Sequence, residues 1–140
     1  MVHLTLPDQW SWRNRLPIDG GLVRKAVGPP GAFKIEPNLI LEEISHPGVS
    51  LEDWTRQALS KLKRDFPSLR LIDVAQTHLG GVTAHVIWAT RTFEFSTTQI
   101  EYLLLTEESG VILVFTCSSA DFSRLSETFA KCAQSLEAIP

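Results

Sequence analysis

The sequence predicts an α+β fold, in which an antiparallel β-sheet is flanked by helices as an α/β/α sandwich. Two segments, residues 51–66 and 122–136, repeat apolar residues every three or four positions, which is typical of amphipathic helices. Between them lie four strand-like segments joined by short turns. Such turns cannot contain the crossover that parallel strands require, so neighbouring strands are expected to run antiparallel.

The first third of the chain predicts strands separated by breakers. Residues 3–7 alternate in polarity and end at a proline, which favours a short first strand. A turn-rich segment, residues 7–21, follows, and residues 22–27 form a plausible second strand. The GPPG sequence at 28–31 predicts a loop, and residues 33–44 predict another strand.

The segment SLEDWTRQALSKLKRDF, residues 50–66, predicts the first helix. Ser50 is a favourable N-cap residue, and Asp53 three positions later resembles a capping box. Pro67 ends the helix. The apolar residues fall on one stripe, which we expect to pack on the sheet: Leu51, Trp54, Ala58, Leu62 and Phe66.

Four further strands and a closing helix complete the prediction. The strands are expected to form a meander over residues 69–77, 82–93, 99–106 and 111–117. A last helix follows at about residues 120–136, with Ser118 and Asp121 as a second capping box. An amphipathic helix must bury its apolar stripe, and we therefore expect both helices to cover the sheet.

Composition restricts the class of protein. The chain has 140 residues, which predicts a single domain over 1–140, and its 44% hydrophobic and 21% charged residues argue against disorder. The net charge of −3 gives no reason to expect a nucleic-acid partner. The densest cationic group is Lys61, Lys63 and Arg64, which fits a solvated helix face or a docking patch for an acidic partner.

The lack of a secretory signal, together with the initial Met, favours a cytoplasmic protein. The start MVHLTLPDQW lacks the features of a secretory signal, and no apolar stretch approaches the roughly 20 residues that span a bilayer. We therefore expect no integral membrane segment, although removal of a leader would give the same sequence. Cys117 and Cys132 are too few for a disulfide scaffold and are expected to be buried thiols.

No pattern in the sequence predicts catalysis, a metal site or a cofactor. The four histidines have no metal-ligand spacing, and no nucleophile elbow is present. The GPPG segment has prolines where a phosphate-binding loop needs N–H donors. The paired carboxylates are adjacent in sequence, so in a strand each pair points to opposite faces: Glu42 with Glu43 and Glu107 with Glu108. We expect a protein that is not an enzyme.

Trp10 and Trp12 are the candidate functional residues. They lie two positions apart in a polar segment that is expected to be a loop. One interpretation is that they cover the core, and the other is that they form an exposed apolar contact for a partner. Both interpretations stay open from the sequence.

Several motifs resemble the DcrB/LpqN group, which shares its fold with the photosystem II protein PsbP and a yeast Ran-interacting protein. These motifs are FKIEPNLILEE at 33–43, SLEDW at 50–54, LGGVTA at 79–84 and LTLPDQW at 4–10. The resemblance implies a central antiparallel sheet between helices. It implies no catalytic residue, because PsbP-like members are mostly binding or assembly factors.

The resemblance also suggests classes of partner. Some cytoplasmic DcrB-like proteins are chaperones that hold apolar transmembrane segments of toxins exported by type VI secretion. LpqN-like members are cell-envelope lipoproteins, but this sequence lacks a lipobox. We therefore expect a non-enzymatic protein-binding or chaperone domain, with a partner such as a secreted effector. The alternatives are a small-molecule or lipid carrier and an enzyme with an unrecognised site. The sequence leaves monomer and homodimer open.

Overall fold

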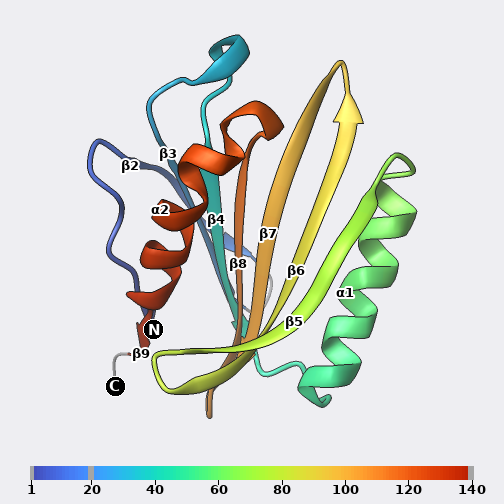
Figure 1. The fold of residues 1–140 in the computed structure, drawn as a ribbon. Helices are drawn as coiled ribbons and strands as arrows, with labels where there is room; N and C mark the ends of the chain where they lie inside the picture. Colours follow the sequence, from blue (N-terminus) through green and yellow to red (C-terminus); the bar gives the residue numbers. More distant parts are fainter. Residues whose placement is uncertain (1, 19–20, 139–140) are drawn as a thin grey trace.

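The fold is a seven-stranded antiparallel sheet with a helix on each face (Figure 1). The computed structural model describes residues 2–18 and 21–138. The strands lie in the order β2-β3-β4-β8-β7-β6-β5, and a separate two-stranded sheet pairs β1 with β9. The strand bounds are β1 Val2–His3, β2 Ser11–Ile18, β3 Gly21–Val27, β4 Asn38–Ser45, β5 Arg70–Leu79, β6 Val82–Phe93, β7 Phe95–Leu105, β8 Ser109–Ser118 and β9 Glu137–Ala138.

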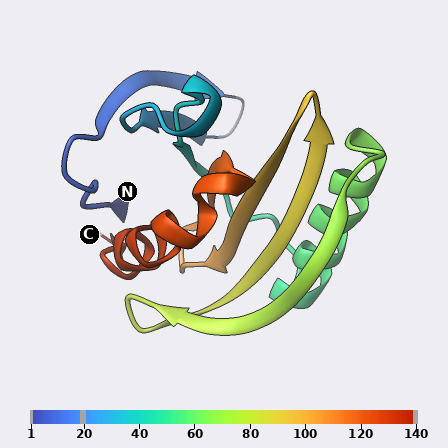
Figure 2. The ribbon, with the colours of Figure 1, turned by 45° about the horizontal axis from the view of Figure 1, so that its top comes forward.

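The two helices cover opposite faces of the sheet. Figure 2 shows strands β5 to β7 curving around α2 (Phe122–Gln134), while α1 (Leu51–Asp65) lies on the outer side of the curve. Two adjacent residues of β7 pack under different helices, because successive side chains of a strand point to opposite faces of the sheet. Leu104 belongs to the core cluster beneath α2, and Leu103 belongs to the cluster beneath α1. The predicted α/β/α sandwich is confirmed.

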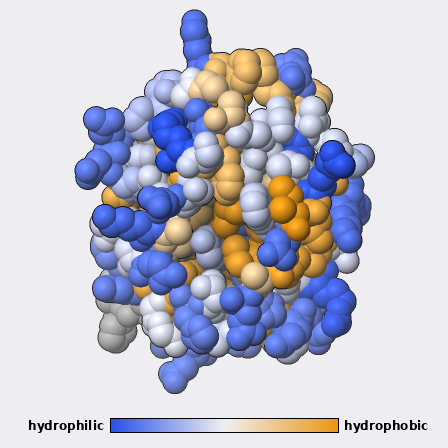
Figure 3. All heavy atoms as spheres, viewed as in Figure 1, coloured by the Kyte–Doolittle hydropathy of each residue, from blue (hydrophilic) through white to orange (hydrophobic). Residues whose placement is uncertain are grey.

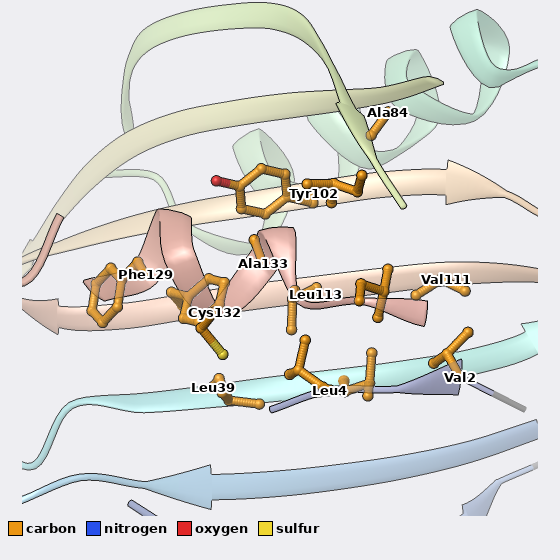
Figure 4. Close-up of a cluster of buried hydrophobic side chains, with 14 of the residues drawn as sticks. Val2, Leu4, Leu39, Ala84, Tyr102, Val111, Leu113, Phe129, Cys132 and Ala133 are labelled. Carbon is orange, nitrogen blue, oxygen red and sulfur yellow. The ribbon is translucent and has the colours of Figure 1, made fainter. Parts of the chain in front are cut away.

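The larger core lies on the concave face, between the sheet and α2 (Figure 4). Phe129 of α2 stacks on Phe115 of β8, with ring centroids 4.9 Å apart. Tyr102 of β7 meets Phe115 edge-on at 6.2 Å. Val2 and Leu4 come from the start of the chain, and both are buried in the same cluster. The N-terminal segment is thus anchored by its apolar side chains.

Helix α1 forms as its sequence predicts. The Ser50 hydroxyl accepts a hydrogen bond from the backbone N–H of Asp53 at 3.1 Å, as an N-cap should. Trp54 is only 7% exposed and contacts Gly110 of β8 so closely that a Cβ there would lie 2.8 Å from the indole. Leu51, Ala58 and Leu62 pack beside it. The predicted stripe therefore faces the sheet.

The predicted four-strand meander is confirmed as β5, β6, β7 and β8, each paired antiparallel with the next. The hairpin between β5 and β6 turns at Gly80 and Gly81, whose φ angles are 57° and 79°. Only glycine adopts such angles without strain, which explains the Gly-Gly sequence at this turn.

Two predictions for the start of the chain are wrong. Residues 7–21 were expected to be a turn-rich segment, but Ser11–Ile18 form the edge strand β2, paired with β3. This strand has no apolar alternation because every residue in it is exposed. Residues 3–7 were expected to form a strand, but only His3 among them does so, in the two-residue strand β1 (Val2–His3). Its partner, β9, comes from the far end of the chain.

Two local predictions near the loop at 28–37 also need correction. Strand β4 begins at Asn38 rather than at Phe33, because Ala32–Lys34 form the short helix η1, and Phe33 has a φ of 58°. The last helix begins later than predicted, after the short helix η2 (Ser119–Asp121). Neither Ser118 nor Asp121 caps it through a side-chain hydrogen bond.

Candidate functional site

A groove of about 740 Å³ runs between α2, the N-terminal segment 5–10 and the loop 28–37. These three elements are distant in sequence and meet only through the fold. The groove mixes polar and apolar side chains from all three. Its lining comprises Thr5, Leu6, Pro7, Asp8, Gln9, Trp10, Pro29, Pro30, Pro37, Arg124, Leu125, Thr128, Lys131, Cys132 and Ser135.

The N-terminal wall is fastened to the end of α2. The backbone N–H of Thr5 donates to the Ser135 hydroxyl at 2.9 Å, and the Cys132 thiol donates to the Thr5 carbonyl at 3.3 Å. A turn closed by the Trp10 N–H and the Pro7 carbonyl, 3.2 Å apart, then brings the chain back toward the sheet. These contacts give the wall a defined position against the helix.

The two tryptophans predicted as a partner contact have different environments. Trp10 is half-buried and meets Phe129 edge-on, with ring centroids 6.1 Å apart. Gly28 lies against the Trp10 ring so closely that a Cβ there would be 2.5 Å from it. Trp10 is thus a wall of the groove. Trp12 lies on β2, is 39% exposed, and has the Arg24 guanidinium 5.3 Å above its ring. A partner contact at either residue stays a prediction.

Asp121 holds the loop wall against α2. Its carboxylate accepts a hydrogen bond from the Ala32 N–H at 2.9 Å and is only 7% exposed. Gly31 permits this contact, because a Cβ there would lie 2.2 Å from the carboxylate oxygen. Arg124 forms an ion pair with Asp121 at 3.3 Å. The sequence predicted that Asp121 caps the helix, but its side chain binds the loop at the Ala32 N–H instead.

The charged groups of the groove are unevenly distributed. Arg124 and Lys131 project from α2, and Asp8 lies on the opposite wall. Arg124 is partly neutralised by Asp121. Within residues 2–18 and 21–138, Lys131 makes no ion pair and is exposed. The helix side of the groove therefore carries an uncompensated positive charge.

The buried thiols are poorly suited to nucleophilic chemistry. Burial raises the pKa of Cys132, which lines the groove, to about 12. Burial, with a smaller contribution from Asp121, raises the pKa of Cys117 to about 11. Because the thiolate is the reactive form, both cysteines stay inert near neutral pH. Both are free and buried, as predicted.

Histidines do not converge on a site. His85 is hydrogen-bonded through Nδ1 to the Thr55 hydroxyl at 2.9 Å, between β6 and α1. His46 Nδ1 accepts from the Gly48 N–H at 3.2 Å in an exposed turn. Across the described part of the chain, no group of three His, Cys, Asp or Glu residues is placed to hold a metal. No helix in that part is long and apolar enough to cross a membrane.

A second surface feature is a phenylalanine cluster formed by Phe33, Phe93 and Phe95. Their exposed fractions are 63%, 87% and 40%, and Phe33 stacks on Phe95 at 4.8 Å. Figure 3 shows pale orange surface at the top of the molecule, where η1 and the β6–β7 hairpin lie in Figure 1. Phe33 and Glu94 have φ angles of 58° and 62°, in the left-handed region.

Sequence reasoning missed the phenylalanine cluster. Phe33 was predicted only as the first residue of the strand at 33–44, and no surface role was expected for it. The available signal was the sequence FEF at 93–95, which places two phenylalanines around one hairpin residue. The stack with Phe33 depends on a contact across about sixty residues of sequence, which no local pattern reveals.

Comparisons with known proteins identify the fold. No family model and no curated protein sequence matches the chain. Among solved structures, PA94 of Pseudomonas aeruginosa, a protein of unknown function, has a TM-score of 0.74 at 14% identity, covering 96% of this chain and 90% of its own. LpqN of Mycobacterium tuberculosis, involved in cell envelope biogenesis, has a TM-score of 0.69 at 16% identity, with coverages of 99% and 83%.

A third similar structure is the cyanobacterial PsbP of Synechocystis sp. PCC 6803, with a TM-score of 0.69 at 9% identity and coverages of 99% and 86%. Identities this low establish the fold alone. The expected fold resemblance is confirmed, and the chain has the PsbP-like fold that it shares with LpqN and PA94.

Proposed function

We propose that this protein is a non-enzymatic binding domain that holds an apolar segment of a protein partner. The phenylalanine cluster is the observation that carries the proposal. Its contact with a partner would bury aromatic surface that the protein itself leaves in water. The proposal includes the chaperone role suggested by DcrB-like proteins, with a secreted effector as the partner and the cytoplasm as the location.

The phenylalanine cluster is energetically unfavourable in the free protein, and contact with a partner would offset this. Exposed aromatic surface favours contact with other apolar surface and is commonly found at protein interfaces. Phe33 and Glu94 are also held in a backbone conformation that disfavours residues with a side chain, at a cost on the order of 1 kcal/mol or more each. Both strained residues lie next to or within the cluster. Strain that concentrates at an exposed aromatic group supports a binding role for that group.

Several features support a non-catalytic role. The cysteines have raised pKa values, and the histidines His46 and His85 are engaged in separate hydrogen bonds. The similar protein LpqN is described by a process, cell envelope biogenesis, rather than by a reaction. These observations favour binding over catalysis.

A synthetic apolar peptide tests the proposal. The peptide would contain about 20 leucine and alanine residues, the length of a membrane-spanning segment, with flanking lysines for solubility. Fluorescence anisotropy would measure its affinity for the full chain. We expect Phe93→Ser to weaken binding about tenfold or more, because an aromatic hot-spot residue commonly contributes over 1 kcal/mol.

Leu16→Ser is the matched control, because Leu16 is 60% exposed on β2 and lies outside the cluster. Both variants should keep the wild-type melting temperature, since neither residue is buried. Equal affinity of the wild type and Phe93→Ser for the peptide, or no binding by the wild type, would contradict the proposal.

A second candidate function is a small-molecule or lipid carrier. The groove favours it, because its volume of about 740 Å³ lies within the range of roughly 300–1,000 Å³ typical of ligand sites. This role would use the groove rather than the phenylalanine cluster. The two candidates can therefore be tested separately.

A further inference from the structure

We propose that the groove binds a single-chain anionic amphiphile, in which an acyl chain carries a carboxylate or phosphate head. The tail would lie along the apolar walls, and the head would lie over the turn of α2 that contains Thr128. This proposal rests on the second candidate function, the carrier, and names the chemical class of its ligand.

The walls suit a chain without hydrogen-bonding groups. Four prolines line the groove: Pro7, Pro29, Pro30 and Pro37. Proline has no backbone N–H, so these positions offer no donor to a polar ligand and present apolar rings instead. Leu6, Trp10 and Leu125 add aliphatic and aromatic surface. An alkyl chain can lie against these apolar positions, because it has no polar group that would need a hydrogen-bond partner there.

The walls are also held in place before a ligand arrives. Asp121 fixes the loop through the Ala32 N–H, and Ser135 fixes the N-terminal segment through the Thr5 N–H. Trp10 is fixed between Gly28 and Phe129. A preformed channel lowers the entropy lost on binding, because fewer side chains need to be ordered.

The charges indicate the sign of the head. The lining contains two cations, Arg124 and Lys131, and one carboxylate, Asp8. Arg124 already pairs with Asp121, whereas Lys131 has no ion pair within the described residues. On the helix wall, an anion is therefore the ligand charge that the groove can compensate. Asp8, which also has no ion pair within the described residues, lies on the N-terminal wall.

The position of the head follows from helix geometry. Side chains on a helix lean toward its N-terminus, so the Lys131 ammonium is expected over the turn of Thr128. Residues three apart share a face, so the Thr128 hydroxyl and the Lys131 ammonium can both donate to one anion. The negative end of the helix dipole, at the C-terminus of α2, would oppose an anion. The turn that contains Thr128 lies before this end of the helix, so the opposition is weaker there.

Four probes with the same twelve-carbon tail test the proposal: dodecanoate, dodecyl phosphate, dodecanol and dodecyltrimethylammonium. Each would be titrated into the full chain below its micelle concentration, with affinity measured by calorimetry and stoichiometry by native mass spectrometry. We expect one molecule to bind per chain, and both anions to bind at least tenfold more tightly than the cation. The two anionic probes distinguish a carboxylate from a phosphate head.

Three variants locate the site. Lys131→Glu should reverse the preference between anionic and cationic probes. Thr128→Trp should fill the groove and abolish binding of all four, while circular dichroism checks that it folds. Lys63→Glu makes the same charge change on an exposed residue of α1, which packs on the opposite face of the sheet, and should leave all affinities unchanged.

The possible results separate this proposal from the functions above. Tight binding of all four probes at similar affinity would keep the carrier function but refute the preference for an anion. No binding of any probe would refute both. Binding that survives both Thr128→Trp and Lys131→Glu would place the ligand outside the groove and overturn the proposal. Phe93→Ser should not change these affinities, which keeps the result independent of the protein-binding proposal.

Discussion

Replacing Trp54 by alanine tests whether α1 is a structural layer of the fold. The Trp54 side chain is 7% exposed and packs against Gly110, Ile87 and Leu103. Gly110 has no side chain that could move into the vacated space. The surroundings can therefore collapse only partly, and the loss should be near the usual cost of a buried Trp→Ala change, about 3–5 kcal/mol.

Urea unfolding followed by circular dichroism would measure this loss. With an unfolding entropy of about 2.1 cal/mol/K per residue, the same loss corresponds to a fall of about 10–17 °C in Tm for a chain of this length. Trp12→Ala is the matched control, because Trp12 is 39% exposed and has the Arg24 guanidinium 5.3 Å above its ring. It should cost less than about 1 kcal/mol. A Trp54→Ala protein as stable as Trp12→Ala would refute the structural role of the stripe.

Three further predictions follow from buried groups. Gly31→Ala should lower stability by about 1–3 kcal/mol in urea unfolding, because its Cβ would displace the Asp121 carboxylate from the loop. Gly48→Ala, at an open position with a φ of 75°, measures the cost of backbone strain without such a clash. Burial raises the pKa of Glu101 to about 7, so the folded state binds a proton more tightly than the unfolded state, and stability should fall on the order of 3 kcal/mol as pH rises from about 4.5 through 7. Glu101→Gln should lose this pH dependence, and an unchanged slope would contradict the assignment. Cys117 and Cys132 should react slowly with a thiol reagent at pH 8 and rapidly in denaturant, whereas fast labelling of the folded protein would show that they are accessible.

The elements that the sequence predicted well are those with a local signal. The stripe of α1 and its Ser50 cap depend on spacing within one helix, and Gly80 and Gly81 mark a hairpin whose strands are adjacent in sequence. Strand β2 has no such signal. It is an edge strand exposed along its length, so its pairing with β3 rather than an apolar pattern defines it.

The candidate site shows the same division. Trp10 was identified because it is an aromatic residue in a polar segment. Its contacts with Gly28 and Phe129 depend on how distant segments meet. Asp121 could be predicted only as a cap, because the Ala32 N–H that it binds lies about ninety residues earlier. Contacts between residues that are far apart in the sequence cannot be predicted from residue spacing.

The pairing of the first and last strands has a consequence for how the protein is made. The wall of the groove at Thr5 is fastened to Ser135, and β1 pairs with β9. During synthesis, the N-terminal segment 5–10, which forms one wall of the groove, leaves the ribosome long before α2, which completes the groove. The sheet can begin to assemble during synthesis, but the groove can close only when the final helix is released. Until then, Val2 and Leu4 lack their burial partners from α2, and this early segment of the nascent chain exposes apolar side chains.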